Sequence, residues 1–553
     1  MDESEVTILT NSDNIEEVSQ VLCKFLKTNE NVFTFPNMHE NNRRVILWTA
    51  LFQHLQKRSS VAVHALCLAT IRVLSRDKSD LENLICEKWI TVLIEKAGLY
   101  NLMDMEDESM VPLEMPEKDV AVEALKCLCN LAFNSEVVRA LCAHTNIAQG
   151  LVARLRVYKD IPFKDEIMLF DMKLLFILTA LRHDIKIKIK DELHGMDYLI
   201  SCLNELVLEA SEKTKDYQAS ASGGDVEGDY CLLHDNQQAI ACEILKAEFN
   251  LIIHSGLDEP SDEAEEAMYL KLIPVLTSLL NVRTSDEVKL VELHSNIANL
   301  LTSVPPNFYP YLTPELTANE TAANVYDGRN MDALQSLVQL LHYKLSNTTN
   351  TKNQYENLSP ILTVLVKSAR GSRSQRKYLR QSVLPPLRDV SRPPEKGTTL
   401  RNQLCRLLTT PVTSVRDLVA EFLFVLCKEK VGRMVKYTGF GNAAGHLAQK
   451  GLLGGGRGAS YSSSSDDSDT EEYLQAQPHI DPVVGCTRPP RVNPFEGMTE
   501  EQKEYEAMKL VNLFDKMVSE GVVKPARVGP DGRPQPVDHV LELRDQPPNR
   551  PQS

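Results

Sequence analysis

The stretch AVEALKCLCNLAF, residues 121–133, decides the fold class of this chain. Its apolar residues recur at i, i+3, i+4 and i+7, the spacing of one face of an amphipathic helix. The same period recurs from about residue 14 to about residue 430, in VILWTALFQHL (45–55), AVHALCLATIRVLS (62–75), FDMKLLFILTALR (170–182), QAIACEILKAEFNLII (238–253), VKLVELHSNIANLL (288–301) and SPILTVLVKSAR (359–370). Segments with the alternating pattern of a strand are hard to find. The sequence therefore predicts an all-α protein.

One signature recurs within these helices and indicates a repeat architecture. It is a helix that ends in Leu-x-Asn-Leu or a close variant, as in LCNLAFNS (128–135), EFNLIIHS (248–255) and IANLLTSV (297–304). Weaker copies are TIRVLSRD (70–77), ILTALRHD (177–184) and LVKSARGS (365–372). Their spacing is irregular, about 40 to 70 residues. The pattern predicts an α-solenoid, in which each helix unit buries its apolar face against the next.

The aligned polar positions predict a partner-binding groove. Residues i and i+4 lie on the same face of a helix, so the aligned residues of successive copies form a column that offers donors and acceptors to an extended or helical ligand. The groove residues predicted in this way are Arg72, Arg76, Asn130, Asn134, Asn250 and Asn299. The alternative is that these side chains cap or fix adjacent turns within the array.

Composition excludes several classes of function. The net charge is −16, which argues against a nucleic-acid binder and against an anionic membrane surface as the main partner. The 12 cysteines lie in apolar stretches, as in a reduced compartment, and Cys127 and Cys129 point to different helix faces, so no metal site is expected. The N-terminus has no secretory signal, and no run of about 18 apolar residues exists. We expect a cytoplasmic protein without a membrane span.

The character of the chain changes after residue 430. The sequence predicts a helical repeat domain over 1–430, a Gly-rich and acidic linker over 431–498, an amphipathic helix over 499–518 and a disordered tail over 519–553. Thr499 and Gln502 are spaced as a capping box. The helix has an apolar face, and we expect Met508, Val511 and Phe514 to contact a partner. The alternative is that this helix docks on the array itself.

No catalytic constellation stands out. The sequence contains no Gly-x-Ser-x-Gly, no His-Glu-x-x-His, and no kinase or NTPase loop. The glycines of GFGNAAG (439–445) do not form a dinucleotide fingerprint, and GGGRGAS (454–460) lacks the Lys of a P-loop. We therefore expect a protein that is not an enzyme and that uses no cofactor.

The acidic run YSSSSDDSDTEEY, residues 461–473, predicts phosphorylation. Ser463, Ser464 and Ser468 each have a carboxylate three residues later, which an acid-directed serine kinase of the casein kinase 2 type requires. Upstream lies a basic cluster that contains Lys367, Arg370, Arg373, Arg376, Lys377 and Arg380. Charge-assisted hydrogen bonds from this cluster to phosphate would pin the tail to the solenoid. The alternatives are a plain solvated linker and a basic helix face in solvent.

Several stretches together resemble the synembryn family, also called resistance to inhibitors of cholinesterase eight. They are VLSRD (73–77), ALKCLCNLAFNS (124–135), QRKYLRQSVLPPLRDV (375–390), LFVLCKEKVGRMVKYTGFGNAAG (423–445), DTEEY (469–473) and NPFEGMTEEQKEYEAMKLVNLFDKM (493–517). They span nearly the whole chain, in order, and the KYTGFGNAAG and EGMTEEQKE segments are the most specific.

The resemblance implies an armadillo/HEAT-type superhelix that acts on the α subunits of heterotrimeric G proteins (Gα). Family members bind GDP-bound or nucleotide-free Gα, promote GDP release and chaperone newly made Gα, so recruitment from the cytoplasm to the cell cortex is expected. The groove takes the C-terminal helix of Gα, here on Arg72, Arg76, Asn130 and Asn134, and the tail helix contacts the GTPase domain near its switch regions. Phosphoserines in the acidic run raise activity; they would be Ser463 and Ser468, although Ser464 or Ser465 could replace Ser463.

Two other functions remain as alternatives. A generic armadillo scaffold of the importin kind would show regular repeats of about 42 residues with Trp–Asn ladders, and this chain has 2 Trp. An enzyme of unrecognised type is the third possibility, and it has no motif in its favour.

Overall fold

The structure is a computed structural model that describes most of the chain. The described residues form two compact units, Met1–Pro305 and Pro306–Ser553. The described ranges are 3–12, 14–38, 40–99, 115–161, 163–220, 231–253, 260, 262–318, 320–347, 353–454, 469–488, 495 and 497–537.

The first unit is built of helices, as the apolar periodicity predicts. They are α1 (Glu3–Asn11), α2 (Ile15–Thr28), α3 (Arg43–Gln56), α4 (His64–Leu74), α5 (Leu81–Leu84), α6 (Glu87–Lys96), α7 (Lys118–Asn134), α8 (Glu136–His144), α9 (Ile147–Val157), α10 (Lys164–Leu181), α11 (His183–Ile187), α12 (Gly195–Ser220), α13 (Asp235–Ile252), α14 (Glu263–Leu280) and α15 (Glu287–Thr302). Short 3-10 or π turns join them at Pro36–Met38, Glu40–Asn42, Arg58–Val63, Tyr158–Asp160 and Lys188–Glu192.

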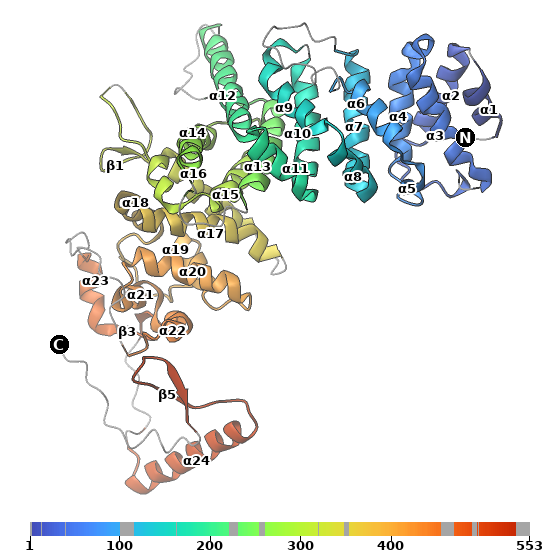
Figure 1. Ribbon diagram of the computed structural model, residues 1–553. Helices are drawn as coiled ribbons and strands as arrows, with labels where there is room; N and C mark the ends of the chain where they lie inside the picture. Colours follow the sequence, from blue (N-terminus) through green and yellow to red (C-terminus); the bar gives the residue numbers. More distant parts are fainter. Residues whose placement is uncertain are drawn as a thin grey trace. The chain divides into compact units, whose positions relative to one another are not determined.

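The signature-bearing helices form one continuous layer of this unit. Helix α4 packs on α7, α7 on α10, α10 on α13, and α13 on α15, and Figure 1 shows these helices side by side in chain order. Leu128, Leu175 and Leu245, from three successive members, are fully buried. A second layer contains α9, α12 and α14, each in contact with the next. This stacking of helix pairs is the arrangement of an α-solenoid.

Side-chain caps begin several of these helices. Helix α7 ends at Asn134, and the next residue, Ser135, accepts a hydrogen bond from the backbone N–H of Val138 at 3.3 Å and so starts α8. Asp262 and Asp286 cap α14 and α15 in the same way. Because such a cap satisfies a backbone donor that has no partner inside the helix, the chain can turn sharply between stacked helices.

The second unit contains shorter helices and three small hairpins. Its elements are a 3-10 helix (Pro306–Leu312), β1 (Val325–Tyr326), β2 (Arg329–Asn330), α16 (Asp332–Asn347), α17 (Gln354–Gly371), α18 (Arg373–Val383), α19 (Leu400–Leu407), α20 (Thr413–Leu426), α21 (Val431–Thr438), α22 (Phe440–Gln449), α23 (Glu471–Ala476), a 3-10 turn (Gln477–His479), β3 (Ile480–Asp481), β4 (Cys486–Thr487), α24 (Glu500–Ser519), β5 (Ala526–Val528) and β6 (Pro534–Pro536). Strands β1 and β2, β3 and β4, and β5 and β6 pair antiparallel. Helix α17 packs on α16, α18 and α20.

The Gly-rich stretch that follows residue 430 differs from the predicted linker, because its glycines join two helices. Gly439 has φ +74° and separates α21 from α22. The N–H groups of Phe440 and Gly441 donate to the carbonyls of Pro482 and Val483 at 2.9 Å each. The glycines thus allow a positive φ and a close backbone approach. The boundary proposed at residue 430 stays a prediction.

The tail also differs from the sequence-based expectation at 526–536, where disorder is predicted and β5 and β6 form a hairpin. Its turn is closed by hydrogen bonds from Gly529 N to Arg533 O at 2.8 Å and from Gly532 N to Gly529 O at 2.9 Å, with Gly532 at φ +69°. Glycine, proline and aspartate favour such a turn, and a high content of proline and charge hides this signal in the sequence.

Replacing Gly439 with alanine tests the role of this glycine. An added Cβ would lie 3.0 Å from the carbonyl oxygen of Val484 and would have to adopt φ +74°, so we expect a loss of about 1–2 kcal/mol of stability. Hydrogen exchange of α21 and α22 measures it. Gly445→Ala, within α22 and with open space around the added Cβ, is the control and should slow exchange slightly. Equal effects of the two substitutions would contradict the argument.

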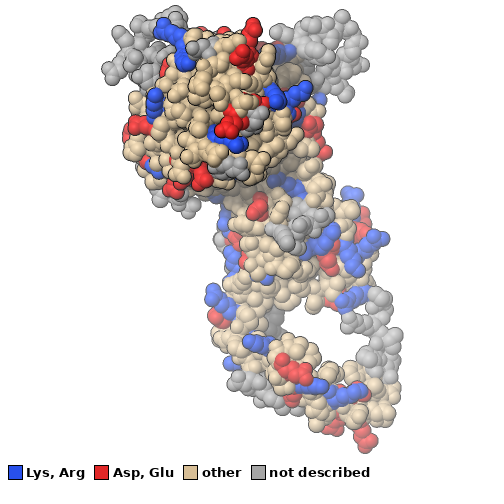
Figure 2. All heavy atoms as spheres, turned by 90° about the vertical axis from the view of Figure 1, so that its right-hand side faces the viewer, with Lys and Arg blue, Asp and Glu red and all other residues tan. Residues whose placement is uncertain are grey.

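On the face that Figure 2 shows, acidic and basic side chains are interspersed, and no broad area carries one sign. Among the described residues, no helix is long and apolar enough to cross a membrane.

Candidate functional site

Of the two predicted groove arginines, Arg72 lies in the last turn of α4 and Arg76 lies just after this helix ends, and both are half-buried. The Nε of Arg72 donates to the Oε2 of Glu123 on α7 at 2.7 Å. The Nη1 of Arg76 donates to the carbonyl of Glu30 at 2.7 Å, and its guanidinium lies 5.4 Å from the centroid of the Phe33 ring. Desolvation lowers the pKa of Arg76, and the neighbouring charge of Arg72 adds to this effect. The structure thus brings the two arginines together.

The predicted asparagines bind the neighbouring helix. On α7, the Nδ2 of Asn130 donates to the carbonyl of Arg72 at 3.4 Å, and that of Asn134 donates to the carbonyl of Ser75 at 3.1 Å. Carbonyls at the end of a helix lack an intrahelical partner, so these amides cap α4. The contacts match the alternative interpretation, in which the asparagines fix adjacent turns, and their role in binding a partner stays a prediction.

Asn250 makes equivalent contacts farther along the same layer. Its Nδ2, on α13, donates to the carbonyl of Phe176 at 3.2 Å and to the hydroxyl of Thr179 at 3.1 Å, both on α10. Asn299 on α15 is half-buried, and its side chain makes no hydrogen bond to any described residue. The six predicted residues are therefore half-buried polar side chains in or next to the helices of one layer, and their role as a partner-binding groove stays a prediction.

Sequence reasoning missed a second row beside this column. Helices α7 and α13 share the spacing Glu-x-x-Lys-x-x-x-Asn, which was a readable signal. Lys126 pairs with Glu123, and Lys246 with Glu243, at 2.8 Å each. Helix α10 lies between α7 and α13 and contributes two aromatic rings. The centroid of the Phe170 ring lies 5.2 Å from the Nζ of Lys126 and 5.0 Å from that of Lys173. The centroid of the Phe176 ring lies 4.9 Å from the Nζ of Lys246. We call the two rows together the polar ladder. It presents positive and negative side chains, side-chain amides and aromatic rings within one unit.

The predicted basic cluster is only partly at the surface. Arg376 is 9% exposed, and its Nη1 donates to the carbonyl of Ala369 at 3.0 Å. Arg370 pairs with Glu421 and lies 3.8 Å from Glu429. Arg373 is exposed, and Lys377 and Arg380 are half-buried. The Nη2 of Arg380 lies 3.4 Å from the hydroxyl of Tyr437 on α21.

Ser463, Ser464 and Ser468 lie outside the described residues, but the chain that follows them is anchored. Asp469 pairs with Lys436 on α21, and Lys436 lies 4.3 Å from the ring of Tyr473. The hydroxyl of Thr470 donates to the carbonyl of Leu387 and accepts from the N–H of Tyr473 at 3.2 Å. Because Lys436 adjoins Tyr437, which Arg380 contacts, the end of the acidic run lies near one end of the basic cluster.

Helix α24 has the predicted capping box and an uncovered apolar face. Thr499 N donates to the Oε1 of Gln502 at 3.1 Å, and Gln502 N donates to the Oγ1 of Thr499 at 3.3 Å. No residue of α24 is buried. Met508 is 61% exposed and Phe514 38%, and Val511 between them is half-buried. A helix with a free apolar stripe needs a partner surface to bury it.

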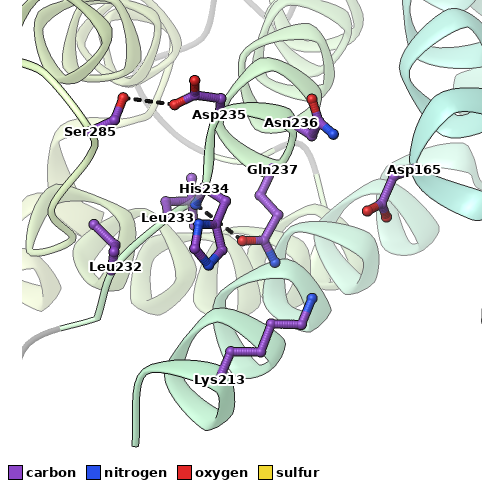
Figure 3. Close-up of a pocket in the computed structure, with 9 residues that line it drawn as sticks. All are labelled: Asp165, Lys213, Leu232, Leu233, His234, Asp235, Asn236, Gln237 and Ser285. Carbon is purple, nitrogen blue, oxygen red and sulfur yellow. Dashed lines mark hydrogen bonds between the residues drawn. The ribbon is translucent and has the colours of Figure 1, made fainter. Parts of the chain in front are cut away.

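A cavity of about 510 Å³ lies at the N-terminal end of α13 (Figure 3). The Oε1 of Gln237 accepts a hydrogen bond from His234 N at 3.2 Å, while its Nε2 has no hydrogen-bond partner among the described residues. Asp235 accepts from Ser285 at 2.7 Å and pairs with Lys289 at 2.5 Å. The lining has one lysine, Lys213, against two aspartates, so its charges do not favour an anion.

Most of the cysteines are buried, as expected from their apolar surroundings, whereas Cys23 and Cys86 are exposed. The Sγ of Cys127 donates to the carbonyl of Leu68 at 3.0 Å, and burial raises the pKa of this thiol well above its ordinary value. A thiol with a raised pKa is a poor nucleophile. Within the segments that the structure describes, no group of three or more His, Cys, Asp or Glu could hold a metal ion.

Comparison with solved structures supports the fold alone. A chain from a study of a phosphorylation switch that controls the interaction between cadherin and beta-catenin superimposes with a TM-score of 0.50 at 14% identity, over 83% of this chain and 72% of that chain. A designed armadillo repeat protein in complex with the peptide (KR)4 matches with a TM-score of 0.30 over 54% of this chain and 98% of that chain, at 16% identity. The predicted all-α armadillo-type solenoid is confirmed.

Comparison of sequences identifies close relatives along nearly the whole chain. Chaperone Ric-8A of Gallus gallus is 39% identical over 97% of this chain and 96% of its own length. Chaperone Ric-8A of Danio rerio is 40% identical over 93% of this chain and 91% of its own length. Chaperone Ric-8 of Drosophila melanogaster is 36% identical over 97% and 96%. Residues 67–533 match the family described as guanine nucleotide exchange factor synembryn. The resemblance predicted from sequence motifs is thus confirmed, and this chain belongs to the synembryn family of chaperones and guanine nucleotide exchange factors.

Proposed function

We propose that this chain is a non-receptor guanine nucleotide exchange factor and folding chaperone for Gα. Family membership over residues 67–533 is the observation that carries the proposal. The chain binds GDP-bound or newly made Gα, speeds GDP release and stabilises the nucleotide-free form, and it is recruited from the cytoplasm to the cell cortex where its partner resides. It regulates another protein's nucleotide without binding one.

The polar ladder is the proposed seat of the C-terminal helix of Gα. Its two Glu–Lys pairs present both signs of charge, and Phe170 and Phe176 add aromatic surface between them. A helix with mixed polar and apolar residues can meet such a surface with hydrogen bonds and with apolar burial. The half-buried asparagines hold the rows in register, because each amide donates a hydrogen bond to a backbone carbonyl at the preceding helix of the layer.

Helix α24 is the proposed clamp on the GTPase domain. Burial of a side chain such as Met508 or Phe514 contributes about 1.5–3 kcal/mol, and both side chains are exposed in this chain alone. With the C-terminal helix held in the groove, the guanine-binding loops of Gα lose support, and GDP leaves because the state that binds it is less populated. The same two surfaces cover apolar area that a half-folded GTPase exposes, which accounts for chaperoning.

GDP release from purified Gα tests the proposal. Adding the chain should speed release, and Arg72→Ala with Asn130→Ala, or Met508→Ser with Phe514→Ser, should each reduce this effect at least about tenfold, as loss of central contacts does at other interfaces. The second pair is the cleaner test, because α24 buries none of its residues.

Lys271→Ala is the matched control. Lys271 is 62% exposed and pairs with Asp197 in the other helix layer, so its loss should leave GDP release unchanged. The thermal midpoint of each variant separates lost contacts from lost folding, which matters for Asn130 because it caps α4. If no class of Gα released GDP faster with the wild-type chain, the proposal would be wrong.

The acidic run is the proposed site of regulation by a casein kinase 2-type enzyme. Each phosphate on Ser463 or Ser468 adds about −1.5 to −2 charge, next to a segment that Lys436 and Leu387 already hold. Arg373, Lys377 and Arg380 would then bind the phosphates. Ser464 is the third candidate serine.

Alanine at Ser463 and Ser468 tests this latch. After treatment with the kinase, the wild type should show stronger hydrogen-exchange protection of α23 and faster GDP release than the variant, with activity raised about two- to tenfold as one to three charge-assisted bonds form. Unchanged protection and unchanged activity in the variant would contradict the latch while leaving the exchange function intact.

A further inference from the structure

A second cavity, in the unit Pro306–Ser553, has a strongly positive lining. It encloses about 380 Å³ between the loop that follows α18 and the start of α19. Its lining residues are Pro385, Pro386, Leu387, Arg388, Asp389, Arg392, Lys396, Gly397, Thr398, Thr399, Arg401 and Asn402. Four cationic side chains against one carboxylate leave three positive charges, in a chain whose net charge is −16.

The four cationic side chains of this cavity are unpaired within the described part of the chain. The side chains of Arg388, Arg392, Lys396 and Arg401 make no hydrogen bond or ion pair with any described residue. The carboxylate, Asp389, is occupied elsewhere, because it accepts from the N–H of Ser391 at 2.9 Å and from its hydroxyl at 2.6 Å. Other basic residues of this chain show the contrast: Arg370 and Lys436, for example, are paired. Unpaired like charges gathered in one concavity repel each other unless an anion joins them.

Other groups of the lining also favour an anion. These Ser391 hydrogen bonds, and then the charges of Arg392 and Arg401, hold the pKa of Asp389 below its ordinary value. Thr398 and Thr399 lie at the start of α19, where the first backbone N–H groups carry the positive end of the helix dipole. Pro385 and Pro386 restrict the backbone of one wall before any ligand arrives.

We propose that this cavity binds an inositol ring that carries two or more phosphates. One phosphate carries about −1.5 to −2 charge at neutral pH, so about two are needed to balance three positive charges. Arginine binds phosphate with paired N–H donors, and three of the four cations are arginines. The volume lies within the range of about 300–1,000 Å³ for small-molecule sites.

The lining disfavours other phosphate ligands. It contains no aromatic side chain on which a nucleobase could stack, so a nucleotide would gain nothing from its base. A phosphopeptide with one phosphate would leave positive charge uncompensated. The cavity beside α13, with one lysine against two aspartates, lacks this preference. The ligand is either the free inositol polyphosphate or the headgroup of a phosphoinositide in a membrane.

Calorimetric titration and vesicle sedimentation of the dephosphorylated full chain test the proposal. The probes are inositol hexakisphosphate in solution, and phosphatidylcholine vesicles with about 5% phosphatidylinositol 4,5-bisphosphate. We expect saturable binding that weakens with added salt. Arg392→Glu with Lys396→Glu should weaken it at least about tenfold; both residues are exposed and unpaired, so folding should be unaffected.

Lys524→Glu with Arg527→Glu is the control, since it changes net charge equally at two exposed residues outside the lining. Its binding should stay within about twofold of wild type. Binding in solution assigns the site to the free polyphosphate, and binding to vesicles alone assigns it to the lipid headgroup. Undiminished binding in the cavity variant, or binding of a phosphoserine peptide but of neither inositol probe, would overturn the proposal.

Discussion

Replacing Asp171 with alanine is expected to lower the free energy of unfolding of the first unit by about 3–5 kcal/mol. Asp171 on α10 and Arg154 on α9 are both 0% exposed. The Nη1 of Arg154 donates to both carboxylate oxygens at 3.2 Å, and the hydroxyl of Tyr158 donates to one of them at 2.6 Å. The Nη2 of Arg154 donates to the carbonyl of Ala97 at 2.7 Å. Removing the carboxylate leaves a buried guanidinium without its counter-ion.

Urea unfolding followed by tryptophan fluorescence measures this loss in the right unit, because both tryptophans, Trp48 and Trp89, lie in it. The control is Asp184→Ala, which breaks the ion pair between Asp184 and Arg182. Because the Asp184 side chain is 52% exposed, this substitution should lower the free energy of unfolding by less than about 1 kcal/mol. Replacing Arg154 and Asp171 together by Met and Leu should cost less than Asp171→Ala alone. A loss below about 1 kcal/mol for Asp171→Ala would show that the pair is not stabilised as the contacts suggest.

The helical periodicity predicted the helices of the first unit, and the aligned signature found helices that stack on one another. This succeeded because the apolar stripe of a solenoid helix is read directly from its sequence. The partners of the polar residues could not be read in this way. Asn130 and Asn250 bind helices that lie 58 and 71–74 residues earlier in the chain, and no local pattern reveals which carbonyl an amide will meet.

The contacts of the glycine run and of the basic cluster could not be predicted from composition. A run of glycines such as GFGNAAG is typical of a flexible linker, but here it allows the backbone of α22 to approach residues 482–483. The basic cluster looked like one surface, but Arg376 turns inward to a carbonyl of the preceding helix. In both cases composition records the residue type, whereas tertiary packing decides what the residue contacts.

One residue of the first unit opposes folding at neutral pH. Glu248 on α13 is 0% exposed, and neither of its carboxyl oxygens has a hydrogen-bond partner among the described residues. When α7 and α13 are aligned on Asn130 and Asn250, Glu248 falls on Leu128, a fully buried core residue. Burial raises the pKa of the Glu248 carboxyl well above its ordinary value, because the charged form loses its hydration.

Glu248→Leu is therefore expected to stabilise the first unit at neutral pH. The pKa of this carboxyl is about 4.3 in the unfolded state and higher in the folded state. Its contribution to the stability of the fold is therefore complete only below about pH 4.3, and it is lost as pH rises through the folded-state pKa. Each pH unit over which the folded state keeps the proton while the unfolded state loses it costs about 1.36 kcal/mol, so the gain should be larger near pH 7 than near pH 5. Glu248→Gln, which is polar but cannot ionise, should remove the same pH dependence with a smaller gain. Tryptophan-monitored urea unfolding at both pH values measures the difference, and a gain that is equal at the two would mean that the carboxyl titrates normally and is reached by solvent.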